Sequence, residues 1–146
     1  MIVVIDTNVL YQALRSSSGA SNFILQLIRN HKITLALSLP VFSEYEDVLK
    51  RPDKIKDLGL STIDIDKILR FLAYISKPIT IYYSFRPNLK DEEDNIFIEL
   101  SLASNSDFII TSNTKDFIKS NELKFDDISI VTPAEFVMIW RKNYED

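Results

Sequence analysis

Residues 1–9 read Met-Ile-Val-Val-Ile-Asp-Thr-Asn-Val, and four consecutive apolar residues, Ile2 to Ile5, run directly into Asp6. A short apolar run rich in β-branched side chains is typical of a strand buried on both faces, usually in the middle of a parallel sheet. Asp6 then lies at the carboxyl end of that strand, where open α/β sheets place their ligand sites. Because a carboxylate is costly to bury without a partner, we expect other segments of the chain to converge on Asp6.

The rest of the sequence alternates between strand and helix patterns, which indicates βαβ units. It predicts an α/β fold, a three-layer α/β/α sandwich around a central, mainly parallel sheet, formed by one domain over residues 1–146. Further strands are predicted at 33–37, 79–82, 107–111 and 128–131. Helices are predicted after Asp6, at 20–30, from Ser38 to the break at Arg51-Pro52, at 62–76, 95–104 and 115–119, and after the capping box Thr132-Pro133-Ala134-Glu135. The segments 54–61 and 86–94 are predicted to be a polar connection and a charged loop.

Composition excludes several classes of function. The chain has no Cys, which rules out disulfides and thiolate metal sites. Its two Gly residues lie in no phosphate-binding loop, and the net charge of −4 argues against a broad polyanion-coating surface. No apolar run approaches the roughly 20 residues of a membrane span, and no basic segment precedes Ile2 as in a signal peptide. We therefore expect a cytoplasmic, soluble protein that does not associate with membranes.

Glu44 is the second acidic residue of interest. It lies three residues after Val41 and four before Val48, so these three side chains share one helical face. A Glu inside an apolar stripe points inward and needs a partner.

Two further acids follow at the same predicted edge of the sheet. Asp94 stands at the start of a helix, and Asp116 lies just beyond the predicted strand 107–111. In a parallel sheet the carboxyl ends of the strands meet at one edge. Asp6, Glu44, Asp94 and Asp116 can therefore reach one crevice.

Each acid also has a purely structural interpretation. Asp6 could be a helix cap, and Glu44 could form an ion pair with Arg51 or another basic residue. Asp94 could be an N-terminal acid favoured by the helix dipole, and Asp116 could hold an ordinary surface position. The neighbouring acids 91–93 fit a solvated loop, with Asp91 as a candidate outer-shell ligand.

Convergence of the four acids has a chemical consequence. Carboxylates in one pocket repel one another, and their pKa values rise unless a cation intervenes. Oxygen ligands of this kind suit Mg²⁺ or Mn²⁺. Such an ion lowers the pKa of a bound water and neutralises charge on phosphoryl oxygens, which fits hydrolysis of a phosphodiester.

The motifs together resemble the PIN domain, in particular the toxins of toxin–antitoxin systems related to VapC-like ribonucleases. The resemblance covers essentially the whole chain and rests on Ile5-Asp-Thr-Asn-Val9, Glu44-Tyr-x-x-Val-Leu-x-Arg-Pro52, Asp91-x-x-Asp-Asn-x-Phe97 and Thr111-Ser-Asn-x-x-Asp-Phe117.

The resemblance implies roles for individual residues. Asp6, Glu44 and Asp94 match the core metal-site acids of the family, and Asn8 matches a polar residue that supports the first Asp. Thr111 and Ser112 match a hydroxyl-bearing strand end. Many members have Asp where this chain has Asn113, and others have Asn there with an acid three residues later, as Asp116 is here.

The resulting hypothesis is a Mg²⁺- or Mn²⁺-dependent endoribonuclease that acts on single-stranded RNA. Arg15, Lys90 and Lys115 are candidates for holding phosphates, while the lone His31 is expected at the surface. The resemblance also implies an antitoxin protein as partner and formation of a homodimer. The main alternative is a PIN-like RNA- or protein-binding module with an impaired site. A phosphatase with an aspartyl nucleophile is disfavoured, because Asn8 stands where those sites have a second Asp.

Overall fold

The structure is a computed structural model that describes residues 1–82, 92–115, 117 and 128–144, with the side chains of 92–95 outside the description. Its elements in chain order are β1 (Ile2–Ile5), α1 (Thr7–Arg15), α2 (Ala20–Arg29), β2 (Thr34–Leu37), α3 (Leu39–Leu49), α4 (Pro52–Leu58), α5 (Thr62–Ile75), β3 (Lys77–Pro78), α6 (Glu92–Ser104), β4 (Phe108–Ile110), β5 (Ile130–Val131) and α8 (Pro133–Tyr144).

The described strands form a five-stranded sheet in the order β3-β2-β1-β4-β5, with every neighbouring pair parallel. β1 is the central strand, as its apolar run predicts, and Val3 and Val4 are completely buried. Val3 pairs with Leu35 of β2 on one side, and Ile5 pairs with Ile110 of β4 on the other. The predicted α/β fold with a parallel sheet is confirmed.

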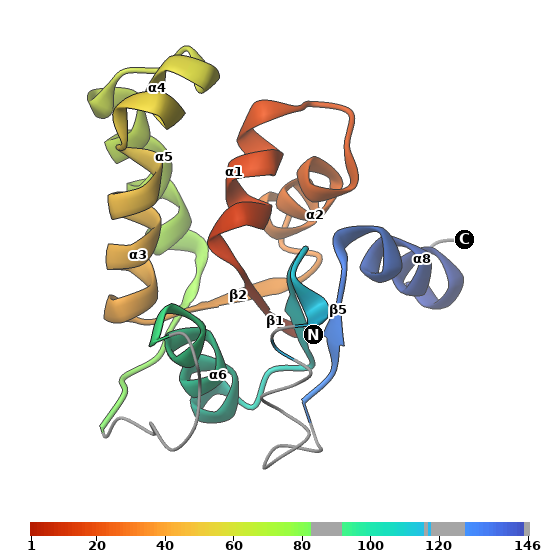
Figure 1. Cartoon of the computed structure of the whole chain (residues 1–146). Helices are drawn as coiled ribbons and strands as arrows, with labels where there is room; N and C mark the ends of the chain where they lie inside the picture. The colour runs from red at the N-terminus through yellow and green to blue at the C-terminus, as the bar shows by residue number, and fades with distance from the viewer. Residues whose placement is uncertain (83–91, 116, 118–127, 145–146) are drawn as a thin grey trace.

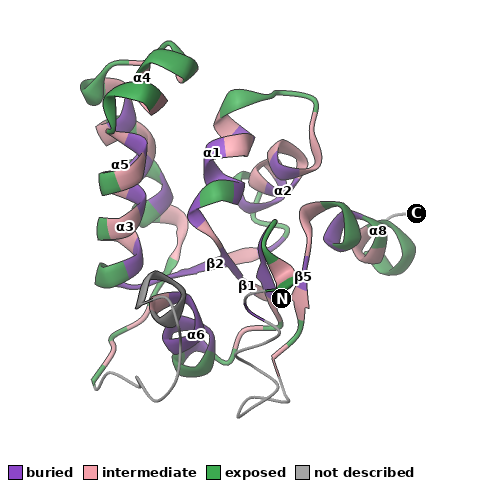
Figure 2. Ribbon diagram, in the orientation of Figure 1, coloured by how far each residue is buried: buried purple, intermediate pink, exposed green. Residues whose placement is uncertain are grey.

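Helices cover both faces of this sheet (Figure 1). α6 lies below the strands and contacts β1, β2 and β4, whereas α1, α2 and α8 lie above them. α3 and α5 stand side by side next to the β2 side of the sheet, and α3 also contacts α1 and α6. The helix faces turned toward the sheet carry the buried residues (Figure 2). α3 is therefore placed to bring a side chain to the carboxyl end of β1.

The predicted polar connection over 54–61 is wrong, because this segment contains α4. Pro52 occupies the first helical position, where its fixed φ suits a helix and no amide hydrogen is needed. Gly59 ends the helix at a φ of +67°, a left-handed conformation that Gly adopts without steric cost. α4 has no buried residue and is exposed or half-buried along its length (Figure 2), so no apolar periodicity indicated it.

The third strand also differs from the prediction. β3 is Lys77–Pro78 instead of 79–82, and it pairs with Ala36 and Leu37 of β2. The Ile79 amide still donates a 2.8 Å hydrogen bond to the Leu37 carbonyl. β-branched residues favoured 79–82 as a strand, but β2 is too short to extend the pairing.

The charged loop predicted over 86–94 is wrong at its end, because α6 already begins at Glu92. Residues 86–91 lie outside the described residues. The helix predicted at 115–119 is partly described: Lys115 and Phe117 are helical, and the other three residues lie outside.

The capping box before α8 is confirmed. The Glu135 amide donates to the Thr132 hydroxyl at 3.1 Å, and the Thr132 amide donates to the Glu135 carboxylate at 3.0 Å. Within the described segments, none of the helices combines the length and apolar character needed to cross a membrane.

Candidate metal centre

A pocket of about 250 Å³ opens at the carboxyl end of β1. Its walls come from α1, α3, α4, α6 and the segment after β4. The lining residues are Asp6, Thr7, Asn8, Tyr11, Glu44, Val48, Arg51, Lys54, Phe97 and Asn113. Two of the four predicted site acids therefore share one pocket, although 38 positions separate them in the sequence.

Hydrogen bonds to the sheet and to α1 fix the backbone of Asp6. Its amide donates a 3.0 Å hydrogen bond to the carbonyl of Ile110, and its carbonyl accepts the first hydrogen bonds of α1 from Val9 and Leu10. The Thr111 hydroxyl donates a 2.8 Å hydrogen bond to Asp6 Oδ2. The backbone is thus fixed by the sheet and the helix, and Thr111 orients the carboxylate.

Thr111 is itself part of a small network. It is completely buried, and its hydroxyl oxygen accepts a 3.0 Å hydrogen bond from the Asn113 amide. This bond folds the chain after β4 back toward α1 and places Asn113 in the pocket. The predicted hydroxyl-bearing strand end therefore contacts the first Asp through Thr111.

Glu44 enters the pocket from the middle of α3. Its neighbours Val41, Tyr45 and Leu49 are completely buried, while Glu44 is half-buried beside that apolar stripe. Arg51, the proposed ion-pair partner of Glu44, is the N-cap residue of α4, and its Nη2 lies 3.1 Å from the carboxylate of Asp47 on α3.

Tyr45 fastens α3 to the central strand. Its hydroxyl donates a 2.6 Å hydrogen bond to the Ile5 carbonyl, immediately before Asp6. Burial, and to a lesser extent the negative charge of Asp6, raises the pKa of Tyr45 well above its usual value. The hydroxyl therefore stays protonated and remains a hydrogen-bond donor.

Aromatic residues close one side of the pocket. Phe97 lines the pocket and is 2% exposed. Its ring centroid lies 6.5 Å from that of Tyr45 and 6.4 Å from that of Phe117. Apolar walls next to carboxylates lower the local dielectric and strengthen their interaction with a cation.

The other two predicted acids cannot be placed. Asp94 lies in the first turn of α6 by its backbone, but its side chain is outside the description, as are Asp116 and Asp91. Among the described residues, no three acidic or His side chains cluster closely enough to hold a metal ion. The described part of the pocket therefore supplies two of the four proposed ligands, Asp6 and Glu44.

The other residues that the sequence suggested for the site lie in different parts of the structure. Asn8 is exposed and lines the pocket, whereas Ser112 lines a separate hollow formed with residues of α1 and α2 and the start of α8. Arg15 lies 3.2 Å from the Asp57 carboxylate, Lys115 is exposed, and Lys90 lies outside the described residues. His31 is exposed, as expected.

The residue types present fit a hard divalent cation. Besides two cations, the pocket is lined by the carboxylates of Asp6 and Glu44, two amides and two hydroxyls, which offer oxygen donors of the kind that Mg²⁺ and Mn²⁺ take. Within the described part of the chain, Thr7 Oγ1 is buried without a hydrogen-bond partner. A buried hydroxyl is normally satisfied by protein, water or ligand, and a hydrated ion in this pocket would satisfy it.

Sequence reasoning assigned neither of the two cations of the pocket to the site, since it considered Arg51 only as an ion-pair partner of Glu44 and gave Lys54 no role. Both belong to the segment around α4 that was expected to be irregular. The proline at position 52 and the glycine at position 59 were the available signs of a helix there.

Comparison with known proteins finds a family, a relative and a solved structure that this chain resembles. Residues 2–115 match the profile of the family described as the PIN domain. The "Uncharacterized protein MJ1680" of Methanocaldococcus jannaschii is 33% identical over 148 residues, covering 96% of this chain and 92% of that protein. A chain in the crystal structure of VapBC2 from Rickettsia felis, bound to a DNA fragment from their promoter, superposes with a TM-score of 0.55 at 17% identity. It covers 90% of this chain and 98% of that one. At that identity the structural likeness concerns the fold alone.

Proposed function

This chain belongs to the PIN domain family, and from that premise we propose that it is a Mg²⁺- or Mn²⁺-dependent endoribonuclease that cleaves single-stranded regions of RNA. The observation that carries the proposal is the meeting of Asp6 and Glu44 in one pocket at the carboxyl end of the central strand. The hydrogen bond from Thr111 to Asp6 supports it, because metal-binding carboxylates are commonly oriented by such partners.

In this proposal Asp6, Glu44 and Asp94 hold the ion, and Asp116 completes its coordination. When bound, the ion supplies an activated water and neutralises charge on the phosphoryl oxygens. The chain's own residues do the positioning: Thr111 orients the Asp6 carboxylate, and Tyr45 holds the backbone carbonyl of Ile5 beside it.

The test is cleavage of a mixed-sequence single-stranded RNA with Mn²⁺ or Mg²⁺, with and without chelator. Wild type, Asp94→Asn and the control Glu46→Gln are compared, with circular dichroism to check folding. Glu46 is a suitable control because it lies on α3 outside the pocket lining, and its partner Lys50 also has Asp66 at 2.6 Å.

We expect cleavage by wild type and Glu46→Gln that the chelator abolishes, and none by folded Asp94→Asn. Metal-dependent cleavage by Asp94→Asn equal to wild type would refute the assignment of Asp94. No cleavage by wild type, together with no divalent-ion binding by calorimetry, would favour the alternative of an RNA- or protein-binding module.

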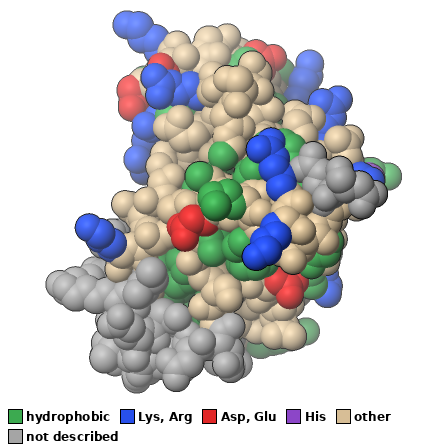
Figure 3. Space-filling model, turned by 90° about the vertical axis from the view of Figure 1, so that its right-hand side faces the viewer, with side chains coloured by type: hydrophobic (Ala, Val, Ile, Leu, Met, Phe, Trp, Pro, Cys, Tyr) green, Lys and Arg blue, Asp and Glu red, His purple; other side chains and the backbone are tan. Residues whose placement is uncertain are grey.

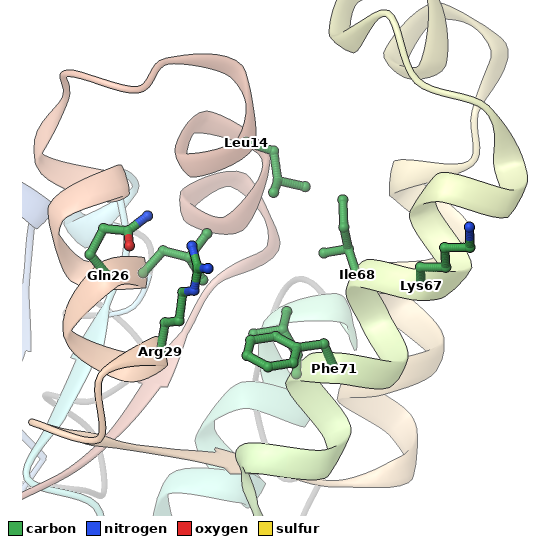
Figure 4. Close-up of a pocket in the computed structure, with 8 residues that line it drawn as sticks. Leu14, Gln26, Arg29, Lys67, Ile68 and Phe71 are labelled. Carbon is green, nitrogen blue, oxygen red and sulfur yellow. The ribbon is translucent and has the colours of Figure 1, made fainter.

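We further propose that the protein is the toxin of a toxin–antitoxin pair. The support within this chain is an apolar groove of about 350 Å³ between α1, α2 and α5, away from the acidic pocket. In Figure 4, Phe71 and Ile68 on α5 face Leu14 on α1 across this groove. Its lining residues are Leu14, Leu25, Gln26, Arg29, Lys67, Ile68, Phe71 and Leu72.

The occupant that fits this groove is an amphipathic helix of the antitoxin with acidic residues beside its apolar face. Phe71 is 45% exposed, so it offers apolar area to a partner. The cations Arg29 and Lys67 are complementary to acidic residues on such a helix.

The proposal that an antitoxin helix binds this groove is tested by co-purification of the protein with the product of a small open reading frame adjacent to its gene. Phe71→Glu should abolish co-purification, whereas Tyr74→Glu should not, because Tyr74 is on the same helix, 88% exposed, and outside the groove. Equal co-purification of both variants would contradict the assignment. Formation of a homodimer, which sedimentation can measure, is a further proposal based on the family resemblance.

A further inference from the structure

Polar contacts join α4 to α1, while its half-buried Leu58 packs against the hydrophobic core. Asp57 on α4 accepts a hydrogen bond from the Tyr11 hydroxyl on α1 and forms an ion pair with Arg15. Lys54 places its ammonium 4.4 Å from the centre of the Tyr11 ring. Because α4 has no fully buried residue, these contacts with α1 help to set its position.

This position brings two cations to the acidic pocket. Arg51 and Lys54 line the same pocket as Asp6 and Glu44 (α4 stands above α3 and next to α1 in Figure 1). Arg51 is the N-cap residue of α4, and Lys54 lies on α4 itself. The cations therefore enter the pocket from the α4 side, whereas Glu44 enters it from α3 and Asp6 from the end of β1.

The ion pairs that Arg51 and Lys54 make within the protein are weak enough to be exchanged. The pair between Arg51 and Asp47 joins two exposed side chains one turn apart, and pairs of this kind contribute about 0.3–0.5 kcal/mol. Lys54 lies 4.0 Å from Asp53, which is itself 75% exposed. A phosphate can displace either carboxylate at little cost.

The surface as a whole does not attract RNA strongly. The net charge is −4, and on the face shown in Figure 3 the basic side chains are dispersed among acidic and apolar ones. Attraction for a polyanion must then come from local groups. Arg51 and Lys54 are suited to this because a guanidinium can bind two phosphate oxygens and an ammonium acts as a point charge.

We propose that Arg51 and Lys54 form a phosphate-binding pair that holds the RNA backbone next to the scissile phosphate, with α4 as its support. This inference rests on the proposed function and deepens it, since it assigns the path of the RNA strand from the metal ligands along α1 and α3 toward α4. The pair positions RNA and takes no part in bond cleavage.

The experiment measures binding of a fluorescent single-stranded RNA by anisotropy at several salt concentrations. All proteins carry Asp6→Asn, so that the RNA is not cut. We compare three variants in this background. They are the double variant Arg51→Gln/Lys54→Gln, the single variant Lys54→Gln and the control Lys56→Gln. Lys56 is on the same helix, exposed, and outside the pocket lining.

We expect the double variant to bind several-fold more weakly. The slope of log K against log salt should become shallower by about 1.4, since each phosphate contact with a single strand contributes about 0.7. Lys54→Gln alone should make this slope shallower by about 0.7, and Lys56→Gln should leave the slope unchanged. In the cleaving protein, the double variant should raise KM for long RNA by a larger factor than it changes kcat.

Two outcomes separate this inference from the proposed function. If wild type cleaves RNA but the double variant has the salt slope and KM of Lys56→Gln, the phosphate-binding pair is refuted while the nuclease stands. If no RNA binds and none is cut, both are refuted.

Discussion

Thr111 and Asp6 are 105 positions apart in the chain, and the hydroxyl of one donates a 2.8 Å hydrogen bond to the carboxylate of the other. The contact arises because β1 and β4 are parallel neighbours in which Ile5 pairs with Ile110. The residue after each strand therefore emerges at the same edge of the sheet. The hydrogen bond thus connects Asp6, which the sequence places at the end of the central strand, with Thr111. The position of the Thr111 hydroxyl beside Asp6 depends on the order of the strands in the sheet.

Thr111→Val removes that hydroxyl at nearly constant volume. Removing a hydrogen-bond partner of a metal ligand typically lowers the affinity for the metal by about 10–100-fold. We therefore expect Thr111→Val to weaken Mn²⁺ binding, measured by calorimetry, by about tenfold. The Asn113 amide also loses its acceptor, and the free energy of unfolding should fall by about 1–2 kcal/mol. Thr111→Ser keeps the hydroxyl and serves as the control. Equal Mn²⁺ affinity in both variants would contradict the role of Thr111.

Glu44→Gln should abolish stabilisation by metal. A ligand at 100 times its dissociation constant stabilises the folded state by about 2.7 kcal/mol. Saturating Mn²⁺ should therefore raise the melting temperature of wild type and of Glu46→Gln, but not that of Glu44→Gln. Thermal denaturation with and without Mn²⁺ measures this without any RNA. A full Mn²⁺ shift in Glu44→Gln would exclude Glu44 as a ligand.

Tyr45→Phe should destabilise the fold. It leaves the buried carbonyl of Ile5 without the donor that lies 2.6 Å away, which costs about 1–3 kcal/mol. Urea denaturation measures the change. Tyr74→Phe is the control, because Tyr74 is 88% exposed and its hydroxyl can bond to water. Equal stability of the two variants would show that this hydrogen bond contributes nothing.

Stability should also fall at high pH because of Tyr45. Burial and the nearby Asp6 raise the pKa of Tyr45 above the ordinary value of 10.0. The resulting stabilisation is fully present below the pKa of the unfolded chain and is lost as pH rises from there toward the folded pKa. Tyrosinate absorbance should show that one of the six tyrosines ionises only as the protein unfolds, and Tyr45→Phe should remove that phase. Reversible titration of Tyr45 near pH 10.0 in the folded protein would be the contrary result.

The sequence predicted most elements and their order, because apolar periodicity is local information. The run Ile2–Ile5 identified the central strand, and the spacing of Val41 and Val48 placed Glu44 beside the buried face of a helix. α4 was missed because it buries no residue and therefore shows no periodicity. The position of β3 was missed because β-propensity cannot indicate where the partner strand ends.

For the candidate site, residue patterns indicated Asp6 and Glu44, and the family resemblance indicated Thr111, Ser112 and Asn113. Neither kind of argument separated Thr111, whose hydroxyl bonds to Asp6, from Ser112, which lines a hollow apart from the acidic pocket. Side chains of adjacent residues at a strand end point in different directions, and in this fold Thr111 is the one that bonds to Asp6.

By itself, the sequence determined the α/β class, the central strand and the acids that follow or flank the sheet, since each depends on residues close together in the chain. Tertiary structure alone decided that Asp6 and Glu44 share a pocket, that Thr111 orients Asp6, and that Arg51 and Lys54 join them from α4. These relationships depend on sheet order and on contacts between α1 and α4, such as Tyr11 with Asp57. Long-range packing creates such contacts, and no local pattern in the sequence encodes them.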